Sequence, residues 1–175
     1  TIFAYQGRVR AIFTVADPIK ANAKASLNAL KAQGIQPILL SGDHVGAVNH
    51  VAKEIGIEEA HGALLPEDKL AILSSHQVGK QAIGMIGDGI NDAPALAKAD
   101  VGFAMGAIGS DVSIETANVA IMDDDLAKLP FFVDVSRKTV RLIKQNIIAA
   151  LGIKVVFFIA ILFGYESMWA AVFAD

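Results

Sequence analysis

The run GDGIND at 87–92 places two carboxylates, Asp88 and Asp92, directly after the apolar stretch 82–86. Its two glycines let the backbone turn tightly. Carboxylates at the end of a strand suit Mg²⁺ bound beside a phosphate. The alternative is a simple turn in which Asp92 caps the next helix. The continuation of the run as APALAKAD, residues 93–100, favours the Mg²⁺ site.

Other polar groups suited to phosphate binding occur earlier in the chain. Ser41-Gly42-Asp43 stands where a helix is expected to begin, so a hydroxyl and free backbone N–H groups could hold phosphate oxygens there. Taken alone, an ordinary turn and cap explains that segment better. Lys69 follows LPED near another helix start and could reach a phosphoryl group, although a lone lysine is more often solvated. Asn91 could orient a phosphate or a metal-bound water.

The set lacks a nucleophile and a transition-metal cluster. The four histidines have no ligand spacing, and we interpret them as surface or loop residues: His44, His50, His61 and His76. The sequence has no cysteine, so it holds neither a disulfide nor a thiolate metal site. The net charge of −3 implies no general affinity for nucleic acid.

Short apolar runs alternate with helical patterns along the first 125 residues. We expect strands at 1–5, 9–15, 35–40, 82–86, 101–105 and 119–122, and helices at 17–34, 45–55, 65–75 and 93–98. This alternation predicts an α/β fold, a parallel sheet with helices on both faces. Chemistry in such folds lies beyond the carboxyl ends of the strands. Ser41, Asp43, Asp88 and Asp92 would all fall at that edge.

The last fifty residues have a different composition. A charged helical pattern over 125–145 precedes the stretch 147–164, which is apolar except for Lys154. Eighteen such residues are near the lower limit for crossing a bilayer, and a buried core helix is the alternative. The basic cluster at 137–144 favours a transmembrane helix whose N-terminal end is cytoplasmic. Residues 168–174 would begin a second span.

Three segments taken in order resemble the phosphorylation domain of P-type cation-transporting ATPases, which has the haloacid-dehalogenase-like fold. They are Ser41-Gly42-Asp43, LPEDK at 65–69 and GDGINDAPALAKADVGFAMG at 87–106. The resemblance runs from about residue 17 to the C-terminus. It implies five segments: the end of a nucleotide-binding region (1–16), an incomplete phosphorylation domain (17–130), a cytoplasmic linking helix (131–146), a transmembrane helix (147–164) and the start of the last span (168–175).

The resemblance also implies roles for individual residues. Asp88 and Asp92 would hold Mg²⁺, Lys69 and Ser41 would contact an aspartyl phosphate, and Asn91 would help to fix the phosphoryl group. The phosphorylated aspartate belongs to an Asp-Lys-Thr-Gly segment that this chain lacks, and most of the ATP site would also lie outside it. The family has Thr-Gly-Asp-Asn where this chain has Ser-Gly-Asp-His. Serine keeps the hydroxyl, whereas the role of His44 is open.

The membrane part resembles the heavy-metal branch, in which two spans follow the phosphorylation domain. The Tyr-Asn pair expected of copper transporters is absent from 147–164. Lys154 and Asp175 instead resemble the zinc, cadmium and lead exporters, with Asp175 as a metal ligand and Lys154 as its counter-ion. A charge at the centre of a membrane helix costs roughly 2.5–3.5 kcal/mol, so each should face a partner or a cavity. Snorkelling of Lys154 and solvation of a terminal Asp175 are the alternatives.

We therefore expect that this chain is part of an ATP-driven export pump for zinc, cadmium or lead. The pump would cross the membrane several times. Its partners would be the transported ion, lipid and the remainder of the pump, and its metal-coordinating Cys-Pro-Cys segment would lie outside this chain. A soluble phosphatase of the same fold is the first alternative. A non-catalytic regulatory module derived from a pump is the second.

Overall fold

The computed structural model describes residues 2–12, 18–77, 82–87, 90–106 and 115–164. Two of the predicted site residues, Asp88 and Asp175, lie outside these ranges. The chain divides into two compact units, Thr1–Lys128 and Leu129–Asp175. Each unit is described by itself.

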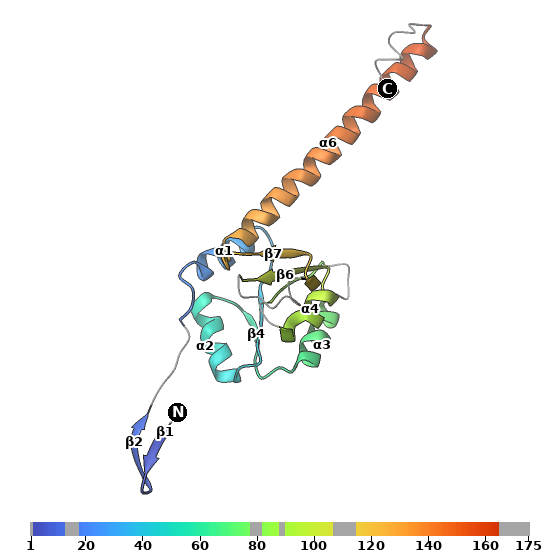
Figure 1. Ribbon diagram of the computed structural model, residues 1–175. Coiled ribbons are helices and arrows are strands. Elements are labelled where there is room, and N and C mark those ends of the chain that lie inside the picture. Colours follow the sequence, from blue (N-terminus) through green and yellow to red (C-terminus); the bar gives the residue numbers. More distant parts are fainter. Residues whose placement is uncertain (1, 13–17, 78–81, 88–89, 107–114, 165–175) are drawn as a thin grey trace. The chain divides into compact units, whose positions relative to one another are not determined.

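The first unit alternates strands with helices, as the sequence predicts (Figure 1). Its elements are β1 (Ile2–Tyr5), β2 (Arg8–Ile12), α1 (Ala23–Ala32), β3 (Ile38–Leu40), α2 (Val45–Ile55), β4 (Glu59–His61), α3 (Pro66–His76), β5 (Gly84–Gly87), the 3₁₀ turn η1 (Ile90–Asp92), α4 (Ala93–Lys98), β6 (Val101–Met105) and β7 (Val119–Ile121).

All strand pairs beyond the first hairpin are parallel. Strand β3 pairs with β4, and β5, β6 and β7 form a three-stranded sheet in that order. Strands β1 and β2 form an antiparallel hairpin whose turn residues, Gln6 and Gly7, both have positive φ. The fold is therefore α/β with a parallel sheet and covering helices, which confirms the predicted fold class.

Two apolar clusters hold the helices to the strands. Residues of α3, β5 and α4 form the first, namely Leu73, Met85, Ala95 and Leu96. Residues of α2 and the segment after it form the second, namely Ala52, Ile55 and Ile57. Figure 1 shows α2 and α3 on opposite sides of β4. The first of these clusters packs α3 and α4 against β5.

The structure differs from the sequence-based prediction at two elements. Helix α1 begins at Ala23 and not near residue 17, because polar contacts hold the segment before it. Lys20 pairs with Asp124 at 2.6 Å, and Asn22 donates a hydrogen bond to Asp125. Strand β4 was not predicted, because its sequence Glu-Ala-His carries neither β-branched residues nor apolar alternation.

The second unit consists mainly of one helix, α6 (Lys128–Leu162), which has 35 residues. It joins the predicted linking helix and transmembrane helix without a break. Among the described residues it is the one helix long and apolar enough to cross a membrane, with a mean hydropathy of 2.1 over its most apolar 18 residues. No residue of that window is buried within the chain.

Candidate functional site

The loop after β3 is closed by its own side chains. The Ser41 hydroxyl donates to Asp43 Oδ2 at 2.9 Å and accepts from the backbone N–H of Asp43 at 3.1 Å. Gly42 between them is exposed. The predicted segment Ser41-Gly42-Asp43 is therefore a preformed turn at the carboxyl end of β3, with a hydroxyl, a carboxylate and backbone groups at the surface.

A second loop attaches this turn to the start of α3. The backbone N–H of Ala63 donates to the Asp43 carbonyl at 2.6 Å, and that of Leu64 donates to the Ser41 carbonyl at 3.1 Å. Ala63 has a φ of +57°, a strained value for a residue with a side chain. A Cβ on Gly62 would lie 2.8 Å from the Cα of Val45, so only glycine allows this approach. The loop after β3 and the loop before α3 are therefore held together by backbone hydrogen bonds.

Helix α3 begins immediately after that loop and presents Lys69 in its first turn. The Asp68 carboxylate accepts from the backbone N–H of Leu65 at 2.9 Å, which satisfies a donor just ahead of the helix. Pro66 occupies the first helical position, where its missing N–H costs nothing. The LPEDK segment is thus a helix start that orients its lysine.

Lys69 forms an ion pair with Asp92. Lys69 Nζ lies 2.6 Å from Asp92 Oδ1, and the two side chains are only 14% and 15% exposed. Asp92 is the N-cap residue of α4, yet its side chain makes no capping hydrogen bond. The simple-turn alternative, in which Asp92 caps the helix, therefore fails, because the carboxylate points across to α3.

Gly87 provides the room for this arrangement. A Cβ at Gly87 would lie 2.6 Å from the Cβ of Asp92, closer than any two such atoms approach. The backbone at the end of β5 therefore lies directly against the side chain of Asp92. Asn91 lies in the intervening 3₁₀ turn and is exposed. Two elements far apart in sequence, α3 and η1, thus meet at the carboxyl end of β5.

The carboxylate of Asp92 is a suitable oxygen ligand for Mg²⁺. Its carboxylate is not used for capping, it is mostly shielded from solvent, and hard oxygen is the ligand type that Mg²⁺ takes. Asp88, the predicted second ligand, lies outside the described residues. Within the described ranges, no group of three histidine, aspartate or glutamate side chains is arranged to hold a metal ion.

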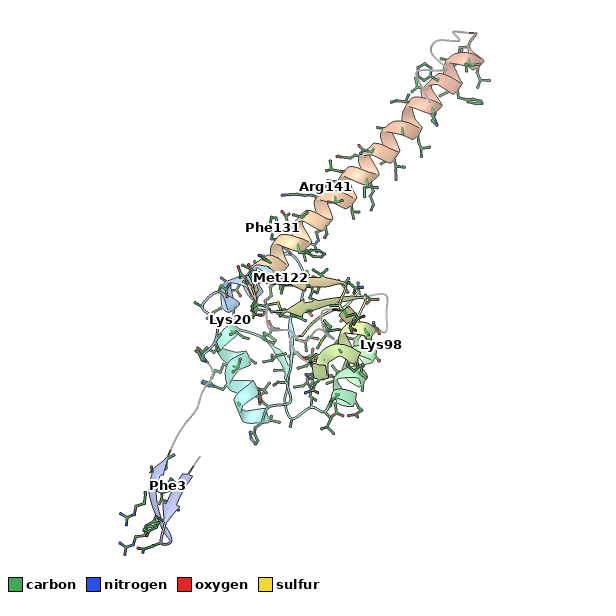
Figure 2. The ribbon with its side chains drawn as sticks, viewed as in Figure 1. Phe3, Lys20, Lys98, Met122, Phe131 and Arg141 are labelled. Carbon is green, nitrogen blue, oxygen red and sulfur yellow. The ribbon has the colours of Figure 1, made fainter. Side chains whose placement is uncertain are left out.

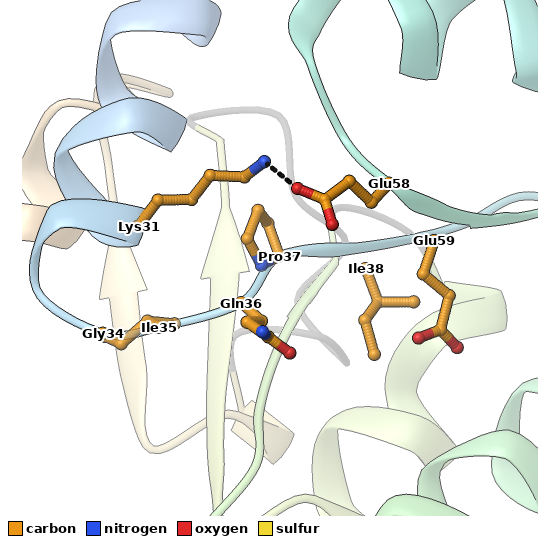
Figure 3. Close-up of a pocket in the computed structure, with 8 residues that line it drawn as sticks. All are labelled: Lys31, Gly34, Ile35, Gln36, Pro37, Ile38, Glu58 and Glu59. Carbon is orange, nitrogen blue, oxygen red and sulfur yellow. Dashed lines mark hydrogen bonds and ion pairs between the residues drawn. The ribbon is translucent and has the colours of Figure 1, made fainter.

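A surface pocket of about 320 Å³ lies at the N-terminal ends of β3 and β4 (Figure 3). Ile38 and Glu59, the first residues of β3 and β4, line it together with Lys31, which pairs with Glu58 at 3.3 Å. Because Ser41 follows the other end of β3, this pocket is not part of the site.

The histidines are at least partly exposed, and three of them also have defined structural contacts. His44 is the N-cap of α2 and accepts from the backbone N–H of Gly46 through Nδ1 at 3.1 Å. His61 in β4 and His76 in α3 both contact Glu59 Oε1, at 3.0 and 3.3 Å. The hydrogen bond from His61 is the main cause that holds the pKa of Glu59 below its ordinary value. No pattern in the sequence indicates that Glu59, His61 and His76 lie together, because β4 was not predicted.

Lys154 belongs to the second unit, where it is an exposed residue of α6. It lies within the apolar part of the helix, as predicted. Its proposed partner, Asp175, lies outside the described residues. The structure therefore fixes the helical position of the lysine and leaves the pairing as a prediction.

A parallel sheet with acidic and basic groups at the carboxyl ends of its strands is typical of α/β enzymes. The family profile described as "Hydrolase: haloacid dehalogenase-like hydrolase" matches residues 1–100. The chain belongs to the haloacid dehalogenase-like hydrolases.

The chain is also similar in sequence to cation-transporting ATPases. The chain is 41% identical over 175 residues to a probable cadmium-transporting ATPase of Listeria monocytogenes, covering 99% of this chain and 25% of the relative. It is 39% identical over 170 residues to a copper-exporting P-type ATPase of Staphylococcus haemolyticus, covering 97% and 21%. The crystal structure of a zinc-transporting PIB-type ATPase in the E2.Pi state matches with a TM-score of 0.85 and 38% identity, over 91% of this chain and 26% of that one.

The chain thus spans about a quarter of the length of these relatives. The match extends through nearly the whole chain and so includes α6 as well as the α/β unit. These matches confirm the predicted resemblance to heavy-metal P-type ATPases. Identity over this stretch does not separate cadmium from copper transporters, because the two relatives differ by only two percentage points.

Proposed function

We propose that this chain is the C-terminal part of an ATP-driven export pump for zinc, cadmium or lead that works through an aspartyl phosphate. The observation that carries the proposal is the shielded pair of Lys69 and Asp92 at 2.6 Å. The turn formed by Ser41 and Asp43 is hydrogen-bonded to the loop from which the helix of Lys69 begins. Such a pair places a positive donor and a hard oxygen ligand at one strand edge, as phosphoryl transfer requires.

Each residue of the site has a distinct role in the proposed reaction. A carboxylate oxygen of an aspartate outside this chain attacks the γ-phosphorus of ATP, ADP leaves, and water later releases phosphate and regenerates the carboxylate. Lys69 and the Ser41 hydroxyl would hold the phosphoryl oxygens, and Asn91 would orient the group. Asp92, with Asp88, would hold Mg²⁺, which neutralises the negative charge of the transferred phosphoryl group when bound.

The strand pairing supports an external source for the phosphorylated aspartate. Among the described strands, β3 pairs only with β4, and β5 pairs only with β6, so each has an edge without a partner. Both edges belong to strands that lead directly into the site. A strand supplied by another segment of the same protein would complete the sheet and bring its aspartate between Ser41 and Asp92.

The cargo proposal rests on the membrane part. Lys154 lies in the apolar stretch of α6, where a charge is costly unless a polar group or a cavity faces it. Asp175 would serve as such a group without metal and as an oxygen ligand for Zn²⁺ with metal. The basic residues that precede the apolar stretch favour a cytoplasmic α/β unit and a multi-pass membrane protein.

Metal-stimulated ATP hydrolysis by the full-length protein tests this proposal. Zinc, cadmium and lead are expected to stimulate hydrolysis, and copper(I) is not. Asp175→Ala is expected to abolish the stimulation while leaving metal-independent phosphorylation by inorganic phosphate intact, because the phosphoryl site is in the other unit. Stimulation by copper(I) alone, or unchanged zinc stimulation in Asp175→Ala, would contradict the cargo assignment.

A further inference from the structure

The segment of α6 just before its apolar stretch carries more positive charge than its neighbours can neutralise. Between Lys128 and Tyr165 the sequence contains a single acidic residue, Asp134. Asp134 pairs with Lys138 at 2.8 Å. Three other cations, Arg137, Arg141 and Lys144, are exposed and have no ion pair within the described part of the chain.

These three cations lie along one side of the helix. At 100° per residue, positions 137, 141 and 144 fall within a sector about 60° wide. We call them the basic stripe. Figure 2 shows the side chain of Arg141 projecting from α6. The stripe therefore concentrates three positive charges on a single face.

A different face of the same segment is apolar. Phe131, Val135 and Leu142 lie on the side of the helix away from the basic stripe, and they are 69%, 43% and 59% exposed in this chain. An apolar face of this kind packs against protein or lipid tails. The basic stripe is suited to a partner of opposite charge.

The distance from the apolar stretch identifies that partner. At about 1.5 Å per residue, Lys144 stands about 4.5 Å, Arg141 about 9 Å and Arg137 about 15 Å before Ile147, where the apolar stretch begins. The polar layer of a bilayer is about 5–8 Å thick on each side, and long cationic side chains extend toward it. Lys144 and Arg141 thus reach the headgroups directly, while Arg137 stands within about a Debye length of them.

We propose that the basic stripe binds the phosphate groups of anionic phospholipids in the leaflet where α6 enters the membrane. The cations without partners, their shared face and their height above the apolar stretch carry this inference. It rests on the membrane location of α6 in the proposed function, but not on ATP hydrolysis or on the transported metal. An acidic segment elsewhere in the protein is the competing partner.

The test compares variants that remove the same charge from neighbouring positions. The full-length protein is reconstituted in vesicles of phosphatidylcholine with phosphatidylglycerol, and lipid selectivity is measured by electron paramagnetic resonance of spin-labelled lipids. The selectivity ratio compares the protein-bound fractions of the two labelled lipids. Arg141→Gln removes a stripe charge, and Lys138→Gln removes a charge already paired with Asp134.

Arg141→Gln is expected to lower the phosphatidylglycerol selectivity of its site several-fold, and the triple variant Arg137→Gln, Arg141→Gln, Lys144→Gln by at least about tenfold. Lys138→Gln should leave the selectivity within about twofold. Equal effects of Arg141→Gln and Lys138→Gln would overturn the proposal, because they would mean that only total charge matters. Unchanged selectivity in the triple variant would also overturn it and would favour an acidic protein partner.

This readout separates the two proposals. A protein that shows stripe-dependent lipid selectivity but no metal-stimulated hydrolysis would support the lipid site and refute the pump assignment. A protein with no immobilised lipid of either kind would show that α6 does not enter the bilayer, and it would refute the lipid site together with the membrane location.

Discussion

At the scale of single residues, the contact between Lys69 and Asp92 explains why this sequence needs glycine at the end of β5. The ion pair requires the Asp92 carboxylate to turn toward α3, and the backbone of Gly87 lies directly against the Asp92 side chain. Any side chain at position 87 must move Asp92. The glycine therefore acts on the chemistry through the position of the carboxylate.

Gly87→Ala should consequently reduce ATP hydrolysis by the full-length protein by about 10²-fold, because small displacements of a positioning group cost that much. Gly84→Ala is the matched control on the same strand. Its added Cβ would meet a ring atom of Phe103 at 3.5 Å, which is an ordinary contact. Equal activity of the two variants would mean that Asp92 does not need its observed position.

At the scale of elements, Glu59 connects β4 to the last turn of α3 through His76, and it also contacts His61 in its own strand. The donated hydrogen bond from His61 lowers the pKa of Glu59 from its ordinary value of 4.5. A lowered carboxyl pKa means that the folded state favours the ionised form. The contribution of Glu59 to the stability of the fold is therefore complete when the pH is above the ordinary pKa of the group. It is lost as the pH falls through the lowered pKa.

Glu59→Gln should weaken the protection of α3 and β4 amides against hydrogen exchange near neutral pH. The pair is nearly half exposed, so the expected loss is small, about 0.2–1 kcal/mol. The difference from the wild type should shrink as the solution becomes more acidic than the lowered pKa. Glu58→Gln, whose carboxylate side chain is 92% exposed, is the control. A difference that grows in acid would contradict the assignment.

Comparison of the elements with the sequence shows which parts of the fold and of the site could be predicted from local patterns. Polar residues after apolar runs predicted a shared edge of the sheet, because parallel strands end together. Lys69 and Asp92 meet there, and the backbone of Ser41 is hydrogen-bonded to Leu64 in the loop before α3. Strand β4 escaped detection because three residues of mixed polarity become a strand only through pairing with β3. The late start of α1 depends on contacts with Asp124 and Asp125, about a hundred residues away, which no local pattern encodes.

At the scale of the whole molecule, the chain combines an α/β unit with a helix of membrane-crossing length. The two units differ in the environment that their polar residues occupy. In the proposed pump, the phosphoryl chemistry takes place at the polar edge of the α/β unit, and the charge of Lys154 serves metal transport in the apolar helix. The proposed pump requires both units in one protein, so its activity belongs to the full-length protein and not to a single unit.

The most direct test of this account measures the aspartyl phosphate itself. Full-length wild-type protein and its Asp92→Asn variant are incubated with radiolabelled ATP, with and without zinc or cadmium, and quenched in acid. The account predicts a metal-dependent label that hydroxylamine releases in the wild type. In Asp92→Asn that label should fall by about 10²-fold or more, because the Mg²⁺ ligand is lost. Equal labelling of Asp92→Asn and wild type would contradict the account, as would a wild type whose label does not depend on metal.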